Sequence, residues 1–269
     1  MGLECTPIFH NGQMTKCPTC GGSVRLIFHG KNLDHLEHID SVDRQKLAAQ
    51  IAGPDAKTVK EQRRQRNGKR TVAIVGLAPA TCAFAPFDEP DVGIGKHIEI
   101  WGLNEAHDFS WFRNWTRWFQ LHPKEYFARA IDPKRGVKFH YDWLKENHNK
   151  PIYMQYVYPE IPDSVEYPLQ AVVDKFFGKM WHGEEQPKFF NSSVDYMIAL
   201  ALLEGKFDRI ELYGVEMAND TEYIYQKSGA TFWMGVARGC GVEVYFPKEC
   251  RIMSGPLYAY QGQGPRNEV

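Results

Sequence analysis

Residues 192–213 read SSVDYMIALALLEGKFDRIELY and carry the clearest folding signal in the chain. Ser192 is a good N-cap, and Asp195 three residues later completes a capping box. Gly205 ends the apolar stretch and can adopt the left-handed conformation that terminates helices, so we predict a helix over residues 193–204. A strand follows directly, and a helix that leads into a strand is the repeating unit of α/β proteins.

The same alternation of strands and helices extends back to residue 71. Thr71 to Val75 is a short β-branched run bounded by turn residues, which is typical of a strand buried on both faces. Further strands are predicted at 97–101, 118–121, 152–155, 209–213 and 242–246, and a second helix at 231–238. The pattern predicts an α/β fold, a Rossmann-like, doubly wound and mainly parallel sheet over residues 71–269.

The composition is that of an ordinary globular protein. Hydrophobic residues make up 43% of the 269 and charged residues 24%, which argues against wholesale disorder. No apolar run approaches the roughly 20 residues that cross a bilayer, and no secretory signal is visible, so we expect a cytoplasmic protein without a membrane partner. A net charge of -1 gives no global signature of nucleic-acid binding.

Two smaller segments precede the α/β domain. Residues 1–30 are rich in Cys, His and Gly, and residues 31–70 form a polar and basic helical linker with a short helix predicted at 40–52. Lys57 to Arg70 carries seven basic residues against one acid, which is typical of a solvated linker. As an arm, it could also contact DNA phosphates or a protein partner.

A Cys-x-x-Cys pair near the N-terminus indicates a zinc-knuckle-like segment. Cys17 and Cys20 have the spacing with which zinc ribbons supply two thiolates, and Cys5 and His10 are the nearest candidates for the other two ligands. A reduced pair without metal is the alternative. We expect a zinc ion here to be structural.

Three turns after predicted strands, or before a predicted helix, offer polar groups to a ligand. Parallel sheets bind ligands beyond the C-terminal ends of their strands. Small residues after the first strand would let a phosphate approach backbone N–H groups, an asparagine after the second offers a donor and an acceptor, and a polar helix start attracts anions. A tight turn, a turn-capping asparagine and a helix cap are the structural alternatives. The residues concerned are Gly76, Pro79, Asn104, Asn191, Ser192 and Ser193.

Two titratable residues follow predicted strands at the same rim. His122 comes after the third strand and is a candidate general base or phosphate contact, although a structural histidine explains it equally well. Glu216, followed by Asp220, comes after the strand at 209–213 and could bind a sugar hydroxyl or a metal. The aromatic residues between Trp101 and Phe119 could stack on bases, but we expect them to fill the core.

These rim segments, in this order, resemble those of bacterial sialyltransferases of the Campylobacter lipooligosaccharide type. They also resemble the related motility accessory factor and archaeal hydroxymethylpterin pyrophosphokinase group. The resemblance rests on the turn from Gly76 to Ala80, on Trp-Gly-Leu-Asn ending at Asn104, and on the helix start at 191–197 leading to Leu212 through Glu216. The Trp-Gly-Leu-Asn and Leu-His-Pro segments also resemble uncharacterised proteins of tailed phages, which favours a phage origin.

The resemblance implies a CMP-type nucleotide held by Gly76, Pro79, Asn104, Ser192 and Ser193. It also implies a catalytic histidine between the last two strands, and this sequence has no histidine after residue 182. Ala80 and Glu216 replace the serine and aspartate found in that group. Another side chain must therefore deprotonate an acceptor, and His122, Glu216, Tyr223 and Tyr225 are the candidates.

The function indicated first is a nucleotide-dependent transferase, glycosyltransferase-like and using a nucleotide-activated donor. One alternative is Mg²⁺-dependent diphosphoryl transfer, as in the pterin pyrophosphokinases, with Glu216 and Asp220 as metal ligands. The other alternative is not enzymatic. It is a nucleotide- or nucleic-acid-binding accessory protein that docks through the zinc knuckle and the basic arm.

Overall fold

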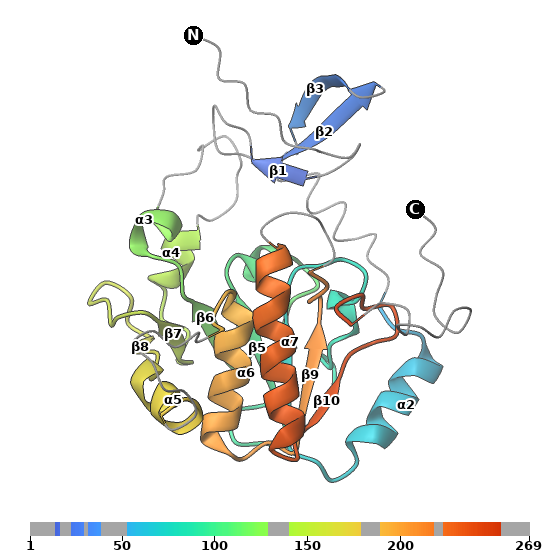
Figure 1. Cartoon of the computed structure of the whole chain (residues 1–269), viewed down its shortest axis with the longest axis vertical. Coiled ribbons are helices and arrows are strands. Elements are labelled where there is room, and N and C mark those ends of the chain that lie inside the picture. Colours follow the sequence, from blue (N-terminus) through green and yellow to red (C-terminus); the bar gives the residue numbers. More distant parts are fainter. Residues whose placement is uncertain are drawn as a thin grey trace.

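The computed structural model describes residues 14–16, 23–29, 32–38, 53–128, 140–178, 189–217 and 223–253 (Figure 1). The first three ranges are strands β1 (Met14–Lys16), β2 (Ser23–His29) and β3 (Asn32–His38), which form an antiparallel sheet. Lys16 pairs with Ser23, so the strands on either side of the Cys-x-x-Cys sequence are neighbours. The expected zinc ligands Cys5, His10, Cys17 and Cys20 and the helix expected at 40–52 lie outside the described residues.

A seven-stranded sheet with every neighbouring pair parallel confirms the Rossmann-like α/β fold. Its order is β10-β9-β4-β5-β6-β7-β8. The strands β4, β5, β6, β9 and β10 match predicted ones to within two residues at each end, as does β7. Strand β8 was missed, since it has three residues of which two are exposed. The bounds are β4 Thr71–Val75, β5 Ile98–Leu103, β6 Arg117–Gln120, β7 Ile152–Met154, β8 Ser164–Glu166, β9 Arg209–Tyr213 and β10 Glu243–Tyr245.

Helices cover both faces of this sheet. One face carries α5 (Leu169–Phe176), α6 (Ser193–Glu204) and α7 (Tyr223–Gly239), with α6 and α7 side by side in front of the strands (Figure 1). The α6 bounds are those predicted, whereas α7 begins well before the expected Thr231. The other face packs against short elements, namely η1 (Cys82–Phe84), η2 (Ala106–Asp108), α3 (Lys124–Phe127) and α4 (His140–Leu144).

The aromatic residues expected in the core lie there. Trp101 and Phe119 are fully buried on the α6 face, and Trp118 is fully buried on the opposite face. Position 102 requires glycine for a steric reason, because a Cβ at Gly102 would overlap the rings of Trp118 and Phe112. The aromatic run thus fills both layers of the core rather than presenting faces to bases.

The basic segment, expected as a helical and solvated linker, contains helix α2 (Ala56–Arg66). Asp55 caps it by accepting a hydrogen bond from the Thr58 N–H at 2.7 Å. Gln62 and Arg66 are buried, so at least this arginine is not free to contact phosphates. The burial of Arg66 was not predicted, because its long side chain finds a buried carboxylate on the sheet, which a charge count cannot reveal.

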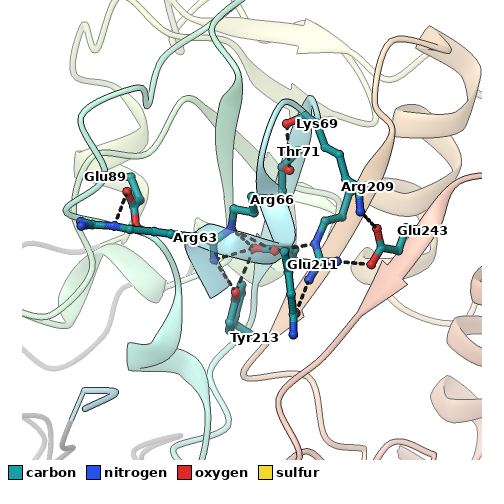
Figure 2. A network of polar contacts seen from close by, with 10 residues as sticks. Arg63, Arg66, Lys69, Thr71, Glu89, Arg209, Glu211, Tyr213 and Glu243 are labelled. Atoms are coloured by element: carbon teal, nitrogen blue, oxygen red, sulfur yellow. Dashed lines mark hydrogen bonds and ion pairs between the residues drawn. The ribbon is translucent and has the colours of Figure 1, made fainter. Parts of the chain in front are cut away.

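Arg66 ties α2 to strand β9 through a buried ion network (Figure 2). Its Nε lies 3.0 and 2.9 Å from the two carboxylate oxygens of Glu211, and its Nη2 donates to the Tyr213 hydroxyl at 2.9 Å. Glu211 also accepts hydrogen bonds from Arg209 Nε at 2.7 Å and from the Tyr213 hydroxyl at 2.8 Å. Buried charges are tolerated only when paired in this way, so the network fixes where α2 sits.

Two glycines let the ends of β4 and β9 come into backbone contact. The Gly76 N–H donates to the Tyr213 carbonyl at 2.8 Å, and the Ala78 N–H donates to the Gly214 carbonyl at 2.9 Å. A Cβ on Gly214 would lie 2.5 Å from the Gly76 carbonyl oxygen, and a Cβ on Gly76 would overlap the Gly214 carbonyl. Only glycine fits at either position.

Gly214→Ala should destabilise the fold more than Gly205→Ala does. Both glycines have a φ of 62°, so both substitutions incur about 1–2 kcal/mol for the left-handed backbone. A Cβ on Gly205 meets nothing within 4 Å, whereas one on Gly214 meets backbone atoms and should add roughly 1–3 kcal/mol. Equal losses in urea-induced unfolding would show that the approach of the two strands is not constrained.

Candidate functional site

The chain reverses its direction of travel across the sheet at β4. Strands β5 to β8 extend to one side of β4, and β9 and β10 lie on the other side. Ligands of open parallel sheets bind at this reversal, beyond the C-terminal ends of the strands. The segments that follow β4, β5 and β9 therefore form the candidate site, and the predicted residues Gly76, Pro79, Asn104 and Glu216 all belong to them.

The turn after β4 has already used several of its hydrogen-bonding groups. The N–H groups of Gly76 and Ala78 bind β9, and the Thr81 hydroxyl accepts the Gly214 N–H at 2.8 Å. Pro79 and Ala80 are exposed at the tip of the turn. Gly76 thus allows close approach of a strand. At the exposed tip, Pro79 has no N–H and the Ala80 N–H binds the Glu216 carboxylate.

Asn104 stands at the C-terminal end of β5 with its backbone held in place. Its φ is 50°, its N–H donates to the Phe119 carbonyl at 3.0 Å, and its carbonyl accepts the Trp118 Nε1–H at 3.1 Å. Its side-chain Oδ1 is buried and has no hydrogen-bond partner among the described residues. The side chain therefore keeps a buried acceptor close to the rim.

Glu216 presents a second acceptor on the other side of β4. Burial raises the pKa of this carboxyl, and the charge of Arg251 and the N–H of Ala80 act in the opposite direction. Its Oε1 is buried without a hydrogen-bond partner within the described part of the chain. The carboxylate thus lies beside the tip of the β4 turn.

The start of α6 is closed by its own capping group. Ser192 and Asp195 form the predicted capping box. The Asp195 carboxylate accepts hydrogen bonds from the N–H groups of Asn191 at 2.7 Å and Ser192 at 2.8 Å, and from the Ser192 hydroxyl at 2.8 Å. Gly229 of α7 lies so close that a Cβ there would overlap the same carboxylate.

The capping interpretation of the helix start is therefore confirmed. The Asn191 side chain donates to the Tyr225 carbonyl at 3.0 Å, and Ser193 is the first helical residue. An anion placed on the first N–H groups would meet the Asp195 carboxylate, so Ser193 is the predicted residue left for a ligand.

His122 is exposed at the C-terminal end of β6, as predicted from its position after a strand. Behind it lies a group of histidines that the sequence did not reveal. His107 Nε2 and His140 Nδ1 are 2.8 Å apart, and the His107 ring stacks on Trp143 with centroids 4.1 Å apart. The two histidines are 33 residues apart in the chain, so only the folded structure shows that they touch.

Burial lowers the pKa of both inner histidines. The pKa of His107 falls to about 3, through desolvation and through the neighbouring His140 and His148. The pKa of His140 falls to about 4, again mainly through desolvation, although Glu105 acts in the opposite direction. Both imidazoles are neutral near pH 7.

A cavity of about 280 Å³ lies at the other end of the strands, near the N-terminal ends of β4 and β5. Its charged side chains are paired, for example Arg63 with Glu89 at 2.8 Å and His97 with Asp91 at 2.5 Å. No predicted site residue lines it. The unpaired acceptors of Asn104 and Glu216 lie at the strand ends and not in this cavity.

Several predicted groups lie beyond what the structure describes. Asp220 and the side chain of Tyr223 are among them, while Tyr225 is exposed on α7. Within the described ranges, no cluster of three or more His, Cys, Asp or Glu side chains could hold a metal ion. No helix in those ranges is long and apolar enough to cross a membrane.

The chain matches no protein-family model and no curated protein. Among solved structures it is similar to the sialyltransferase CstII from Campylobacter jejuni in complex with the substrate analogue cytidine-5'-monophosphate. The TM-score is 0.36 and the identity 14%, over 67% of this chain and 80% of that one.

Asp195 should make stability depend on pH. Burial raises the pKa of Asp195 from 3.8 to about 6, so the folded state holds the proton more tightly than the unfolded state. This contribution is fully present below pH 3.8 and is lost as the pH rises through 6, by about 3 kcal/mol at 1.36 kcal/mol per unit.

Urea unfolding of the wild type and of Asp195→Asn at several pH values measures this effect. The wild-type free energy of unfolding minus that of the variant should fall between pH 4 and pH 7. Asp174→Asn, an exposed position on α5, controls for the loss of one negative charge. A difference that is constant or rises with pH would contradict the assignment.

Proposed function

We propose that the protein is a nucleotide-dependent transferase of the glycosyltransferase-like kind, with its nucleotide lying across the C-terminal ends of β5, β4 and β9. The observation that carries this proposal is the pair of buried acceptors, Asn104 Oδ1 and Glu216 Oε1, on the two sides of β4. Buried polar atoms in folded proteins nearly always have partners. A ligand with hydrogen-bond donors supplies them.

The spacing of the two acceptors suits a nucleotide. Gly102 of β5 and Tyr213 of β9 both pair with Val75 of β4, so the two strands end at the same level. Two strand spacings separate them, roughly 10 Å. A base amino group at Asn104 and ribose hydroxyls toward Glu216 would satisfy both oxygens.

Cytidine is the favoured base because the rim segments resemble those of the CMP-dependent group, and its exocyclic amino group is a donor that matches an amide oxygen. His122, at the end of β6, is the candidate catalytic base. The acceptor substrate would then enter over β5 and β6, beside the donor.

The position of Glu216 favours Mg²⁺-dependent diphosphoryl transfer as the second candidate. A carboxylate beside the Ala80 N–H opposes a bare phosphate at the β4 tip because like charges repel. A divalent cation between the carboxylate and the phosphate would offset this repulsion, and hard oxygen ligands suit Mg²⁺. An absolute Mg²⁺ requirement for binding would favour this reaction.

The experiment is isothermal titration calorimetry with CMP, UMP, AMP, GMP and a CMP-sugar, with and without Mg²⁺. Asn104→Gly should weaken CMP binding about tenfold, since it removes one buried hydrogen bond worth about 1.4 kcal/mol. Glycine tolerates the φ of 50° at this position, so the backbone is not strained.

Asn149→Gly is the matched control. Asn149 has a φ of 54° and is exposed, far along the sequence from the strand ends of the site. It should leave CMP affinity unchanged. The proposal fails if no nucleotide binds the wild type, or if both variants bind CMP as the wild type does.

A further inference from the structure

The cavity near the N-terminal ends of β4 and β5 has more hydrogen-bond donors than its own acids use. Both of its acids are already bound, because Arg63 Nε lies 2.8 Å from Glu89 Oε1 and His97 Nδ1 lies 2.5 Å from Asp91 Oδ2. The ion pairs thus leave N–H groups and one surplus positive charge over. The charged side chains on its walls, apart from His97, are Arg63, Arg66, Lys69, Glu89 and Asp91.

The guanidinium group of Arg66 is buried and has one nitrogen without a hydrogen bond among the described residues. Its Nε and Nη2 are used by Glu211 and Tyr213. Its Nη1 lies 3.7 Å from Glu89 Oε1, which is too far for a hydrogen bond. The side chain is only 6% exposed and lines the cavity. An unpaired donor on a buried charged group is costly, so the space beside Arg66 is where an acceptor belongs.

Further donors border the same space. Arg63 bonds to Glu89 through Nε alone, so its two Nη groups are without acceptors in the described part of the chain. The Gly68 N–H, in the turn after α2, also donates to no described residue. A hydrogen bond of 2.7 Å from the Thr71 N–H to the His97 carbonyl joins the starts of β4 and β5, so these groups surround one opening.

We propose that this cavity binds a phosphate group, carried by inorganic phosphate or by a small phosphate monoester. A phosphate offers acceptor oxygens in several directions, and the planar fork of arginine matches it with two parallel N–H groups. A carboxylate offers only two oxygens in one plane, whereas the donors here come from α2 and from the turn that follows it. The cavity volume of about 280 Å³ is ample for such an anion.

The burial of Arg66 restricts the ligand to a small molecule. This side chain cannot reach the surface of a nucleic acid, but a small anion can enter the cavity and meet Nη1. The site lies at the other end of the strands from Asn104 and Glu216, so it does not depend on the proposed function. A bound phosphate would tie α2 to the start of β4.

The affinity should be modest. The C-terminal end of α2 carries partial negative charge, which the arginines of its last turn offset. Glu89 and Asp91 also repel an anion, so we expect a Kd of about 1 mM rather than a micromolar value.

Amide chemical shifts of the full chain, followed during titration with inorganic phosphate at constant ionic strength, test the site. The largest saturable shifts should occur at Asn67, Gly68, Lys69, His97 and Ile98. The same titration with glycerol phosphate distinguishes the two sources. Tighter binding of glycerol phosphate identifies a monoester as the ligand, and equal or weaker binding identifies the free ion.

Arg63→Gln should weaken phosphate binding about tenfold, because it removes a charged fork from the cavity wall. The side chain of Arg63 is 57% exposed, so the variant keeps its core. Arg64→Gln is the matched control, since it removes the same charge from the next residue of α2. Arg64 is 79% exposed, binds Glu61 and does not line the cavity, so its loss should leave the affinity unchanged.

The absence of saturable shifts around the cavity would overturn the site. Equal weakening by Arg63→Gln and Arg64→Gln would also overturn it, because it would show attraction by net charge alone. Acetate that binds as tightly as phosphate would overturn the class of ligand. The titrations contain no nucleotide, so each of these failures is separate from a failure of the nucleotide site.

Discussion

The approach of Gly76 to Gly214 is the constraint around which the rest of the structure is arranged. Each residue lacks the Cβ that would collide with the other's carbonyl oxygen, and so β4 and β9 stay bonded beyond the end of the sheet. In many parallel sheets the loops diverge at this reversal and leave a crevice. Here the backbone closes the centre, so the polar groups for a ligand stand to either side, at Asn104 and Glu216.

Polar groups near the N-terminal ends of the strands and those near the C-terminal ends differ in how their hydrogen bonds are satisfied. Toward the N-terminal ends of the strands, Arg66 and Arg209 both bind the Glu211 carboxylate, and this network anchors α2 (Figure 2). At the C-terminal ends of the strands, Asn104 Oδ1 and Glu216 Oε1 are buried without hydrogen-bond partners among the described residues. Buried histidines lie behind the exposed His122 there. Fully paired charges stabilise a fold, while unsatisfied acceptors are what a ligand can use. Unpaired buried polar atoms also occur at Gln62, Arg117 and Glu204, and the proposed ligand site is placed at Asn104 and Glu216 because these two residues follow the strands at the reversal.

The sequence predicts the α/β fold and the rim positions well, because both depend on local patterns. The caps at Ser192 and Gly205 set the α6 bounds, and the β-branched run at β4 sets its strand. The role of Arg66 and the pairing of His107 with His140 could not be predicted, since their partners are far away in the sequence. For the Gly76 turn the sequence leaves a phosphate-binding turn and a tight structural turn as alternatives, and the structure adds a steric reason for Gly76 that only the neighbouring strand reveals.

The central claim is that a nucleotide binds at the C-terminal rim, and mapping of backbone amide shifts during a CMP titration tests it most directly. The account predicts the largest shifts at Leu77 through Thr81, at Asn104 and at Gly214 through Glu216. Shifts concentrated around Lys69 and His97, at the N-terminal ends of β4 and β5, would contradict it by placing the ligand in the cavity there. A titration that moves no amide at all would remove the nucleotide site altogether.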